Sequence, residues 1–463
     1  MAKSKKKWKA PVQKNESLEG EVVDLTHEGL GVVKVDQYPI FIEGALTGET
    51  IQFKVIKVGK KFGFGRLEKI LTESPHRVEI VDKVYAQTGT MSLQHLTYDA
   101  QLAFKKQQVE NVLTKIAKLP DVEVQDVIGM EHPYGYRNKA QVPVRKIDGR
   151  LTTGFFRKNS HDLIPLEDFI IQDPEIDKAI VAVRDVMRKY HVKPYNEKEH
   201  TGWLRHIIVR RGHFTGEIMV ILVTNSNEFH RQEEIVKAIQ QAVPTMVSMI
   251  QNINTKKTNV ILGNESKVLI GEDKYQDKLL GMTFNISHQS FYQVNAIQTE
   301  TLYQTAVDYA DLTGNETVID AYCGIGTMTL ALAQKAKHVY GMEIVEPAID
   351  NAKENVKLND VDNVSFEVGP AEKIIVEWAE KGKQVDVVVV DPPRKGLAPE
   401  FIDAVLTMKP EKMVYVSCNP STLARDLRLL NEGGYTVQKV QPVDMFPQTT
   451  HIECVALMSH KGS

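Results

Sequence analysis

The spacing of apolar residues follows three patterns along the chain: short strands, a single helix, and alternating strands and helices. In the range 17–73, short stretches of alternating apolar and polar residues are separated by glycines, as in Ile40–Glu43 and Phe62–Arg66. Four or five short strands joined by glycine turns are typical of a small β-barrel. In the range 97–119 the apolar residues recur at helical spacing instead, so we expect a helix there.

The last third of the chain alternates strand and helix patterns. Thr317–Ala321 is a strand pattern followed by a glycine turn and a helix pattern, and Val385–Val390 is a buried strand pattern that ends at Asp391. Such alternation predicts an α/β domain with a mostly parallel, doubly wound sheet, which places ligands at the carboxyl ends of its strands. The region 125–285 mixes both patterns and predicts an α+β domain.

The length of 463 residues fits about three domains. We expect a basic disordered arm at 1–16, a β-barrel at 17–75, a central domain at 76–285 and a Rossmann-like domain at 286–463. The chain has no run of about 18 uncharged apolar residues and no signal-peptide pattern. Its three cysteines have neither a disulfide framework nor zinc-ligand spacing, so a cytoplasmic protein is expected, with no metal site.

The net charge of −3 conceals two basic clusters. Lys3–Lys14 holds six lysines before the first acid, and Arg137–Lys158 holds seven Lys or Arg against Asp148 alone. Aromatic residues lie in and beside the second cluster: Tyr134, Tyr136, Phe155 and Phe156. Cations beside aromatic rings suit RNA phosphates and unpaired bases, so we expect the central domain at 76–285 to bind RNA. A solvated face and ordinary core aromatics explain the same residues equally well.

Cys418 follows the apolar run Val414–Val416 and precedes a helix pattern for which Ser421 is a plausible N-cap. Only a thiolate is an effective nucleophile, and a helix start favours the ionised form, so Cys418 is a candidate nucleophile. A small buried cysteine without chemistry is the alternative, and it is the commoner role of a free cysteine.

The glycine turn at Gly324–Gly326 discriminates between two cofactors. A dinucleotide fingerprint needs a third glycine where this chain has Thr329. Glu343 lies about 20 residues further on, at the distance expected for a carboxylate that binds ribose hydroxyls, and Asp391 ends the next candidate strand. The pattern favours S-adenosylmethionine over NAD; capping of turns by both acids is the alternative.

Five stretches together resemble the RNA uracil-C5 methyltransferases related to TrmA and RumA. They are Ser290–Asn295, Asp320–Thr327, Asp391–Gly396, Val416–Pro420 and Thr450–Cys454. The N-terminal strands resemble a TRAM domain, an OB-like barrel found on RNA-modifying enzymes. The resemblance covers nearly the whole chain, and it implies that the helix near 97–119 packs on the methyltransferase domain.

The resemblance also implies roles for single residues. Cofactor contacts come from Gln293, Tyr322, Glu343 and Asp391, Cys418 is the nucleophile and Glu453 is the general base. The chemistry agrees with these residue types, because thiolate addition at carbon 6 of uracil activates carbon 5, and a base must then remove the proton from carbon 5. Cys323 and Cys454 are read as packing residues, and the role of His451 is left open.

Many relatives carry four cysteines for an iron–sulfur cluster, whereas the aligned positions here are Asp82, Thr88, Met91 and Phe169. We therefore expect no cluster, as in the cluster-lacking Gram-positive RlmCD-type enzymes that act on 23S ribosomal RNA. The expected activity is methylation of carbon 5 of uridine in 23S rRNA, at one site or two, by a monomer that binds RNA and no membrane. The alternatives are the T-loop uridine of tRNA, a non-catalytic RNA-binding or chaperone protein, and a nucleotide-dependent oxidoreductase.

Overall fold

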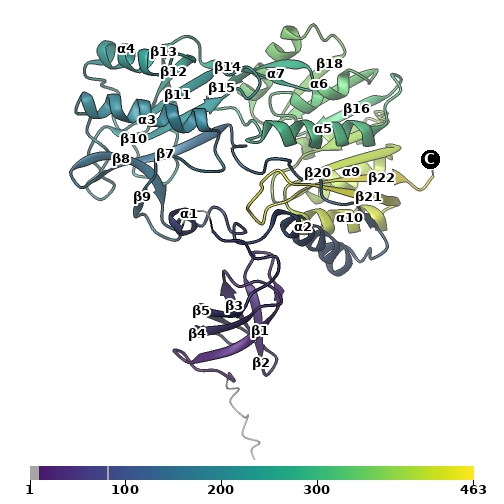
Figure 1. Cartoon of the computed structure of the whole chain (residues 1–463). Coiled ribbons are helices and arrows are strands. Elements are labelled where there is room, and N and C mark those ends of the chain that lie inside the picture. Colours follow the sequence, from purple (N-terminus) through teal and green to yellow (C-terminus); the bar gives the residue numbers. More distant parts are fainter. Residues whose placement is uncertain (1–9, 81–82, 463) are drawn as a thin grey trace, which may run out of the picture. The chain divides into compact units, whose positions relative to one another are not determined.

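The computed structural model describes residues 10–80 and 83–462. It divides into two compact units (Figure 1). The first contains the chain up to Gln108 together with Gln448–Thr450, and the second contains Val109–Pro447 and the segment from His451 onward.

The first unit contains the predicted small β-barrel. Five strands close in the order β1-β2-β3-β5-β4, which confirms the barrel. Gly63 and Gly65 point into it, and a Cβ on Gly65 would lie 2.9 Å from the Phe53 side chain and 3.0 Å from that of Ile42. The glycines of the Phe62–Arg66 run thus keep the interior from overfilling. The strands are β1 (Ser17–Leu25), β2 (Gly31–Val35), β3 (Tyr38–Glu43), β4 (Thr50–Val58) and β5 (Gly63–Thr72).

Residues 1–9 of the predicted disordered arm lie outside the described residues. The rest of that range, 10–16, is packed on the barrel, which differs from the prediction. Val12 is buried in the barrel core, and the Asn15 N–H donates to the Val55 carbonyl at 2.8 Å. One buried apolar residue and one backbone hydrogen bond thus hold this otherwise polar segment against the barrel.

The helical stripe at 97–119 forms α2 (Tyr98–Val112) and a π-helical turn η1 (Leu113–Ala117). Its last residues belong to the second unit, where Val109, Leu113 and Ala117 are buried in the core between η1 and α10 (Pro420–Glu432). Upstream of α2 lies the short helix α1 (Lys83–Thr88).

A seven-stranded sheet forms the α+β part of the second unit, in the order β13-β12-β11-β10-β7-β8-β9. Two amphipathic helices, α3 (Pro174–Lys189) and α4 (Gln232–Ala242), bury their apolar stripes against one face of the sheet. The strands are β7 (Lys139–Ile147), β8 (Arg150–Phe156), β9 (Leu163–Pro165), β10 (Leu204–Arg211), β11 (Ile218–Thr224), β12 (Met246–Ile253) and β13 (Glu265–Ile270).

An eight-stranded sheet in the order β18-β17-β16-β19-β20-β22-β21-β6 confirms the predicted doubly wound α/β domain. The first five strands are parallel, and β22 runs antiparallel to β20. The strands are β6 (Glu123–Val124), β16 (Thr317–Ala321), β17 (His338–Glu343), β18 (Val364–Val368), β19 (Val387–Val390), β20 (Lys412–Ser417), β21 (Tyr435–Val443) and β22 (Glu453–His460).

Helices cover both faces of this sheet. Helices α5 (Ala296–Ala310) and α6 (Thr327–Ala333) share one buried cluster, and α8 (Ala371–Glu380), α9 (Pro399–Met408) and α10 share the other. The remaining helix, α7 (Glu346–Leu358), contacts β15, β17 and β18.

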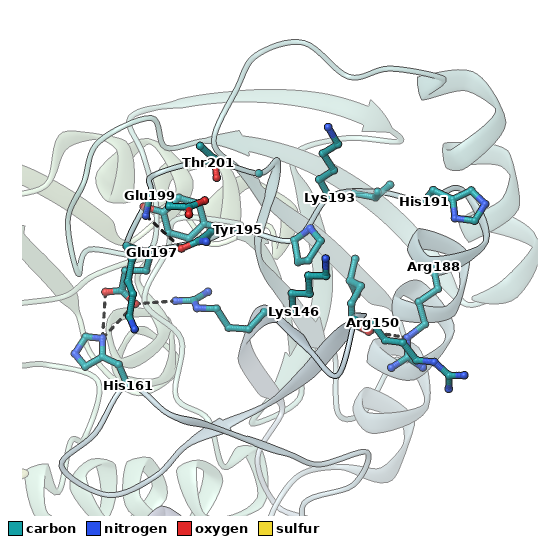
Figure 2. Close-up of a pocket in the computed structure, with 18 of the residues that line it drawn as sticks. Lys146, Arg150, His161, Arg188, His191, Lys193, Tyr195, Glu197, Glu199 and Thr201 are labelled. Atoms are coloured by element: carbon teal, nitrogen blue, oxygen red, sulfur yellow. Dashed lines mark hydrogen bonds and ion pairs between the residues drawn. The ribbon is translucent and has the colours of Figure 1, made fainter.

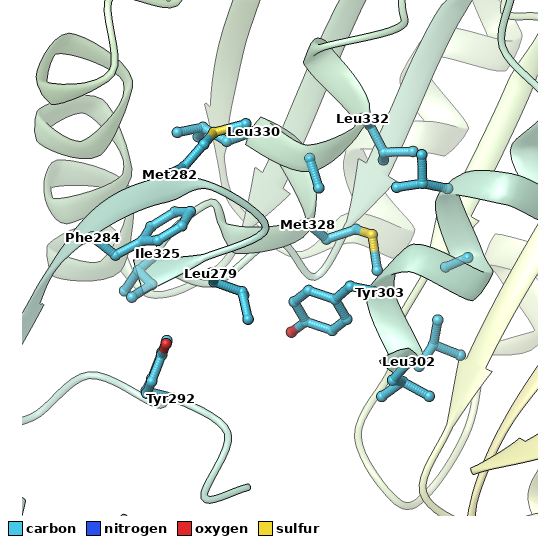
Figure 3. Close-up of a cluster of buried hydrophobic side chains, with 14 of the residues drawn as sticks. Leu279, Met282, Phe284, Tyr292, Leu302, Tyr303, Ile325, Met328, Leu330 and Leu332 are labelled. Carbon is cyan, nitrogen blue, oxygen red and sulfur yellow. The ribbon is translucent and has the colours of Figure 1, made fainter. Parts of the chain in front are cut away.

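Two segments of the predicted central range 76–285 pack with the eight-stranded sheet. Strand β6 forms its last strand, and the hairpin β14 (Lys274–Leu279)–β15 (Met282–Ser287) enters its core. Figure 3 shows Leu279, Met282 and Phe284 of the hairpin gathered with residues of α5 and α6. The α+β part is thus inserted in the α/β domain rather than preceding it.

Candidate active site

The carboxyl edge of the eight-stranded sheet brings the predicted site residues into one row. Glu343 ends β17, Tyr322 follows β16, Asp391 follows β19 and Cys418 follows β20. In the registers, Ala321 is opposite both Met342 and Val390, and Val390 is opposite Tyr415. Neighbouring strands lie about 4.8 Å apart, so these side chains occupy successive positions along the edge. We call this row, completed by Glu453, the catalytic edge.

Glu453 joins the row from the antiparallel strand β22. Ser417 of β20 is opposite Cys454, so the residues one step further along, Cys418 and Glu453, are neighbours across the two strands. Directly opposed residues in an antiparallel pair have Cα atoms about 4.5–5.5 Å apart. Glu453 is only 4% exposed, whereas Cys454 faces the opposite core and is fully buried.

The helix after Cys418 begins at Pro420, and its N-cap is Asn419 rather than the predicted Ser421. The Asn419 side chain accepts from the Ser421 N–H at 3.1 Å, and its amide donates to the Arg394 carbonyl at 3.0 Å. The Thr422 hydroxyl donates to the same carbonyl at 3.1 Å. The loop that carries Cys418 is therefore fastened to the loop that follows Asp391.

The Cys418 thiol has a raised pKa of about 11. Burial is the main cause, the negative charges of Glu453 and Asp391 add to it, and the nearby Arg394 guanidinium opposes it. The helix start gives little help, because Pro420 has no N–H and the Ser421 N–H is already taken by Asn419. The thiol is thus protonated at neutral pH in the absence of ligands.

The two carboxyl groups beside Cys418 also favour their neutral forms. Burial raises the pKa of Asp391 to about 7, and burial followed by the charge of Asp391 raises the pKa of Glu453 well above its ordinary value. Arg394 opposes the second shift. The charge of Asp391 thus acts on Glu453, and the charges of both carboxyl groups act on Cys418, so the three groups lie close enough to interact. Groups with raised pKa values that interact in this way are typical of reactive sites.

The glycine loop shapes the other end of the row. Gly324 and Gly326 have left-handed backbones (φ 56° and 84°), and so does Tyr322 (φ 69°), an uncommon conformation for a side chain of this size. The Gly324 N–H donates to Glu343 Oε2 at 3.1 Å, and the Val345 N–H donates to Oε1 at 2.9 Å. Glu343 is therefore held at the mouth of the loop by backbone amides.

The remaining predicted contacts lie around this loop. The Tyr322 ring is half-buried, with its centroid 6.1 Å from that of Phe401. Gln293 is 8% exposed and precedes α5, and its carbonyl accepts from the Asn138 side chain at 3.0 Å. Cys323 is buried under the loop, as expected of a packing residue.

Sequence reasoning missed two groups at this edge. Arg394 lies in the Asp391–Gly396 stretch, yet only its charge on Cys418 and Glu453 reveals a role. Tyr303 of α5 is buried near Asp391, Asp320 and Glu453, whose charges add to burial in raising its pKa. No spacing signal marks Tyr303, because it comes from a helix face that otherwise carries core residues.

His451 is exposed, with its ring centroid 6.0 Å from that of Phe446.

At the positions aligned with the cluster cysteines of relatives, Met91 and Phe169 are buried, the Thr88 hydroxyl donates to the Tyr85 carbonyl at 2.7 Å, and Asp82 lies outside the described residues. Within residues 10–80 and 83–462, no group of three or more His, Cys, Asp or Glu could hold a metal ion. No described helix is both long and apolar enough to cross a membrane.

Two arginines of strand β10 are internal. Arg210 is 1% exposed and donates to the carbonyls of Ser287, His288 and Ser290. Arg205 is 2% exposed and donates to three other carbonyls in the segment 254–258. Both fasten loops to the central sheet and are unavailable to phosphates.

Known proteins resemble the chain over nearly its full length. The family described as tRNA (Uracil-5-)-methyltransferase matches residues 97–461, and the TRAM domain matches residues 11–67. An "Uncharacterized RNA methyltransferase" of Enterococcus faecalis is 57% identical over 449 residues, which are 97% of this chain and 98% of the relative. A relative of the same description from Lactiplantibacillus plantarum is 55% identical over 97% of this chain and 99% of its own length.

A solved structure agrees with these matches. The tRNA (uracil-54, C5)-methyltransferase of Pyrococcus abyssi, in complex with S-adenosyl-L-homocysteine, has a TM-score of 0.78 and 28% identity, and the match covers 95% of this chain and all of that one. The matches also remove the oxidoreductase and non-catalytic alternatives. The chain is an S-adenosylmethionine-dependent RNA methyltransferase with a TRAM domain, and it belongs to the tRNA (uracil-5-)-methyltransferase family.

Proposed function

We propose that the enzyme methylates carbon 5 of uridine in 23S ribosomal RNA through a covalent bond between Cys418 and uracil. The observation that carries this proposal is the register of β20 and β22, which makes Cys418 and Glu453 neighbours at the catalytic edge. A nucleophile beside a buried carboxyl group is the pair that the reaction requires.

The proposed reaction has four steps. The reaction proceeds from the form in which the Cys418 thiol has lost its proton to solvent and Glu453 is a carboxylate. The Cys418 thiolate adds to carbon 6 of uracil, and the electron pair of the C5–C6 double bond moves into an enolate. Carbon 5 then forms a bond to the methyl group of S-adenosylmethionine, while the bond between that methyl group and the sulfonium sulfur breaks and S-adenosylhomocysteine leaves. Glu453 removes the proton from carbon 5, and the returning electron pair expels the Cys418 thiolate and restores the double bond. The target base must leave its stack to admit these groups, at a cost of a few kcal/mol.

The residues present fit S-adenosylmethionine. Glu343 is presented at the mouth of the glycine loop, where a carboxylate can accept hydrogen bonds from ribose hydroxyls. Left-handed glycines at 324 and 326 allow a close approach of the backbone. We assign cofactor contacts to Gln293, Tyr322, Glu343 and Asp391; the acidic carboxyl groups suit a cationic sulfonium better than a pyrophosphate.

The choice of 23S rRNA as the substrate rests on the resemblance to the cluster-lacking enzymes that act on this RNA. The number of target uridines, one or two, is found by counting the methylated positions. The second candidate is the T-loop uridine of tRNA, which is favoured by the substrate in the name of the Pyrococcus abyssi enzyme. We also propose that the protein acts in the cytoplasm as a monomer.

Trapping with 5-fluorouridine tests both the mechanism and the substrate. The protein is incubated with S-adenosylmethionine and either 23S rRNA or tRNA that contains 5-fluorouridine, and adducts are separated on a denaturing gel. Fluorine cannot be removed as a proton, so the covalent mechanism predicts a stable protein–RNA adduct with 23S rRNA that Cys418→Ala abolishes and Cys454→Ala retains. An adduct with tRNA alone would favour the second candidate. Methylation without any adduct would contradict the role of Cys418.

A further inference from the structure

A large cavity lies at the seven-stranded sheet and contains none of the residues of the catalytic edge. Its volume is about 1220 Å³, and it is lined by the β7–β8 hairpin, the end of α3, the loop 190–202 and Lys257. No lining residue belongs to the eight-stranded sheet or its helices. We call it the basic cavity, because seven of its lining residues are Lys or Arg and three are Asp or Glu.

The charges are unevenly distributed inside the basic cavity. Figure 2 shows Lys146, Arg150, Arg188, His191 and Lys193 on one side, whereas the labelled acids are on the other. On the acidic side, Glu197 pairs with Arg145 at 3.3 Å and with His161 at 3.1 Å. Glu197 is thus engaged where it stands, and the opposite side of the cavity is positive.

Three cations of that side are available to a ligand. Lys146, Arg150 and Lys193 are exposed, and within the described part of the chain none of their side chains has a hydrogen-bond or ion-pair partner. Arg188, by contrast, donates to the Leu151 carbonyl at 2.6 Å, so its position is fixed. A held arginine among three free cations resembles a binding surface more than a network that stabilises the fold.

The shape of the cavity favours a polymer over a small molecule. A volume of about 1220 Å³ exceeds the roughly 300–1,000 Å³ of ordinary ligand pockets, and most of the lining residues are charged or polar. A second cavity of about 430 Å³ shares Arg150 and Arg188 with it. Cations therefore continue from one hollow into the next, as an extended chain of phosphates would require.

We propose that the basic cavity binds phosphates of the substrate RNA at a segment other than the one that enters the catalytic edge. This inference rests on the proposed function, because it takes the ligand to be the RNA that is methylated. Phosphate contacts supply affinity and position without reading sequence. Tyr195 lies in the lining but is 3% exposed and covered by Arg145 and Arg205, so the site holds backbone rather than stacked bases.

The test is a charge-neutralised full-length variant, Lys146→Gln/Arg150→Gln/Lys193→Gln, with in vitro transcripts of 23S rRNA and tRNA as probes. The matched control is Lys178→Gln/Lys189→Gln/Lys237→Gln, which removes three exposed charges from α3 and α4, outside both cavities. Affinity is measured against salt concentration, and KM and kcat of methylation are measured on the same transcripts.

Each phosphate contact contributes about 0.7–0.9 to the slope of log affinity against log salt, so losing three should lower the slope by about 2. We expect affinity to fall about 10- to 100-fold near physiological salt, KM to rise and kcat at saturating RNA to stay within about twofold. An equal loss in the control variant, or no loss in either, would overturn the proposal. If the wild-type enzyme binds RNA but methylates neither transcript, the proposed substrate fails while the salt slopes still decide the role of the cavity.

Discussion

The acidic groups of the catalytic edge are buried or half-buried, whereas the basic cavity has three exposed cations, Lys146, Arg150 and Lys193. Burial raises the pKa of Cys418 to about 11 and that of Asp391 to about 7, so both groups hold their protons more strongly than exposed side chains do. Lys146, Arg150 and Lys193 remain in contact with solvent. Burial shifts the pKa values of the groups at the catalytic edge, as acid–base chemistry requires, whereas exposure leaves the cations of the basic cavity available to a polyanion. The five predictions below test this division between chemistry and affinity.

Replacement of the nucleophile should have the largest effect. Cys418→Ala removes the thiol that we propose adds to carbon 6, so methylation should fall by more than about 10⁴-fold while RNA affinity changes little. Incorporation of labelled methyl groups measures the first quantity, and filter binding measures the second. A comparable loss in Cys454→Ala, whose thiol faces the other core, would mean that the loss is structural.

Replacement of the base should arrest the reaction part-way. Glu453→Gln keeps the size of the side chain but cannot take the proton from carbon 5, so turnover should fall by about 10²–10⁴-fold. Unlike Cys418→Ala, this variant should accumulate a covalent adduct with ordinary uridine that already carries the methyl group. Mass spectrometry shows whether the uracil in the adduct carries the methyl group. An adduct without the methyl group would mean that Glu453 acts before methyl transfer.

The sequence predicts the architecture well because periodicity is local. Glycine-separated strands define the barrel, and apolar strands followed by helices define the doubly wound sheet. Periodicity cannot place the hairpin β14–β15 in the core of the α/β domain, because its alternation of apolar and polar residues predicts two strands but not the domain on which they pack. It also cannot foresee that Val12 packs on the barrel, since that contact is non-local.

The site is predictable to a different degree. Acids at strand ends follow from the strand patterns, and the resemblance adds Glu453 and Gln293. The pKa of Cys418 does not follow, because the expected help from the helix start is cancelled by Pro420 and Asn419. The arginines in the stretch 203–211 have the composition of an RNA-binding surface, but two of them are buried. The sequence alone does not distinguish a buried arginine from an exposed one, so the structure is needed to assign the role of each.

A buried arginine should therefore act on stability where an exposed one acts on binding. Arg205→Met leaves the carbonyls of Asn254, Lys256 and Thr258 without their donor, which should lower the free energy of unfolding by about 2–4 kcal/mol. Arg150→Met, in the same domain but exposed, should change it by less than about 0.5 kcal/mol. Urea unfolding of both variants measures the difference; similar values would contradict the assignment of the two arginines to different roles.

Arg394 should tune the chemistry without being required for it. Its charge lowers the pKa of Cys418, so Arg394→Gln should raise that pKa further and reduce the thiolate at any given pH. One unit of pKa corresponds to about tenfold in thiolate near neutral pH, so adduct formation should slow by about tenfold and its pH profile should move to higher pH. Arg394→Lys, which keeps the charge, should restore most of the rate. Rates of 5-fluorouridine trapping between pH 6.5 and 9.5 provide the profile, and an unshifted profile in Arg394→Gln would separate Arg394 from the thiol.

The smallest expected effect has the opposite sign, and it belongs to the acidic side of the basic cavity. Glu197 contacts Arg145 and His161, and although burial raises its pKa, these two partners lower it below its ordinary value, so Glu197 is ionised at neutral pH. Glu197→Gln removes that negative charge and frees Arg145 for one more phosphate, so RNA affinity should rise by about two- to fivefold and the salt slope should steepen by less than about 1. The gain should shrink as pH falls through the lowered pKa, because the wild-type carboxylate then becomes protonated and the two proteins carry the same charge. Tighter binding in Glu197→Gln together with weaker binding in the lysine and arginine variants would follow from the electrostatics of a phosphate site and not from a general loss of structure, whereas weaker binding in both would show that the cavity contributes through its shape.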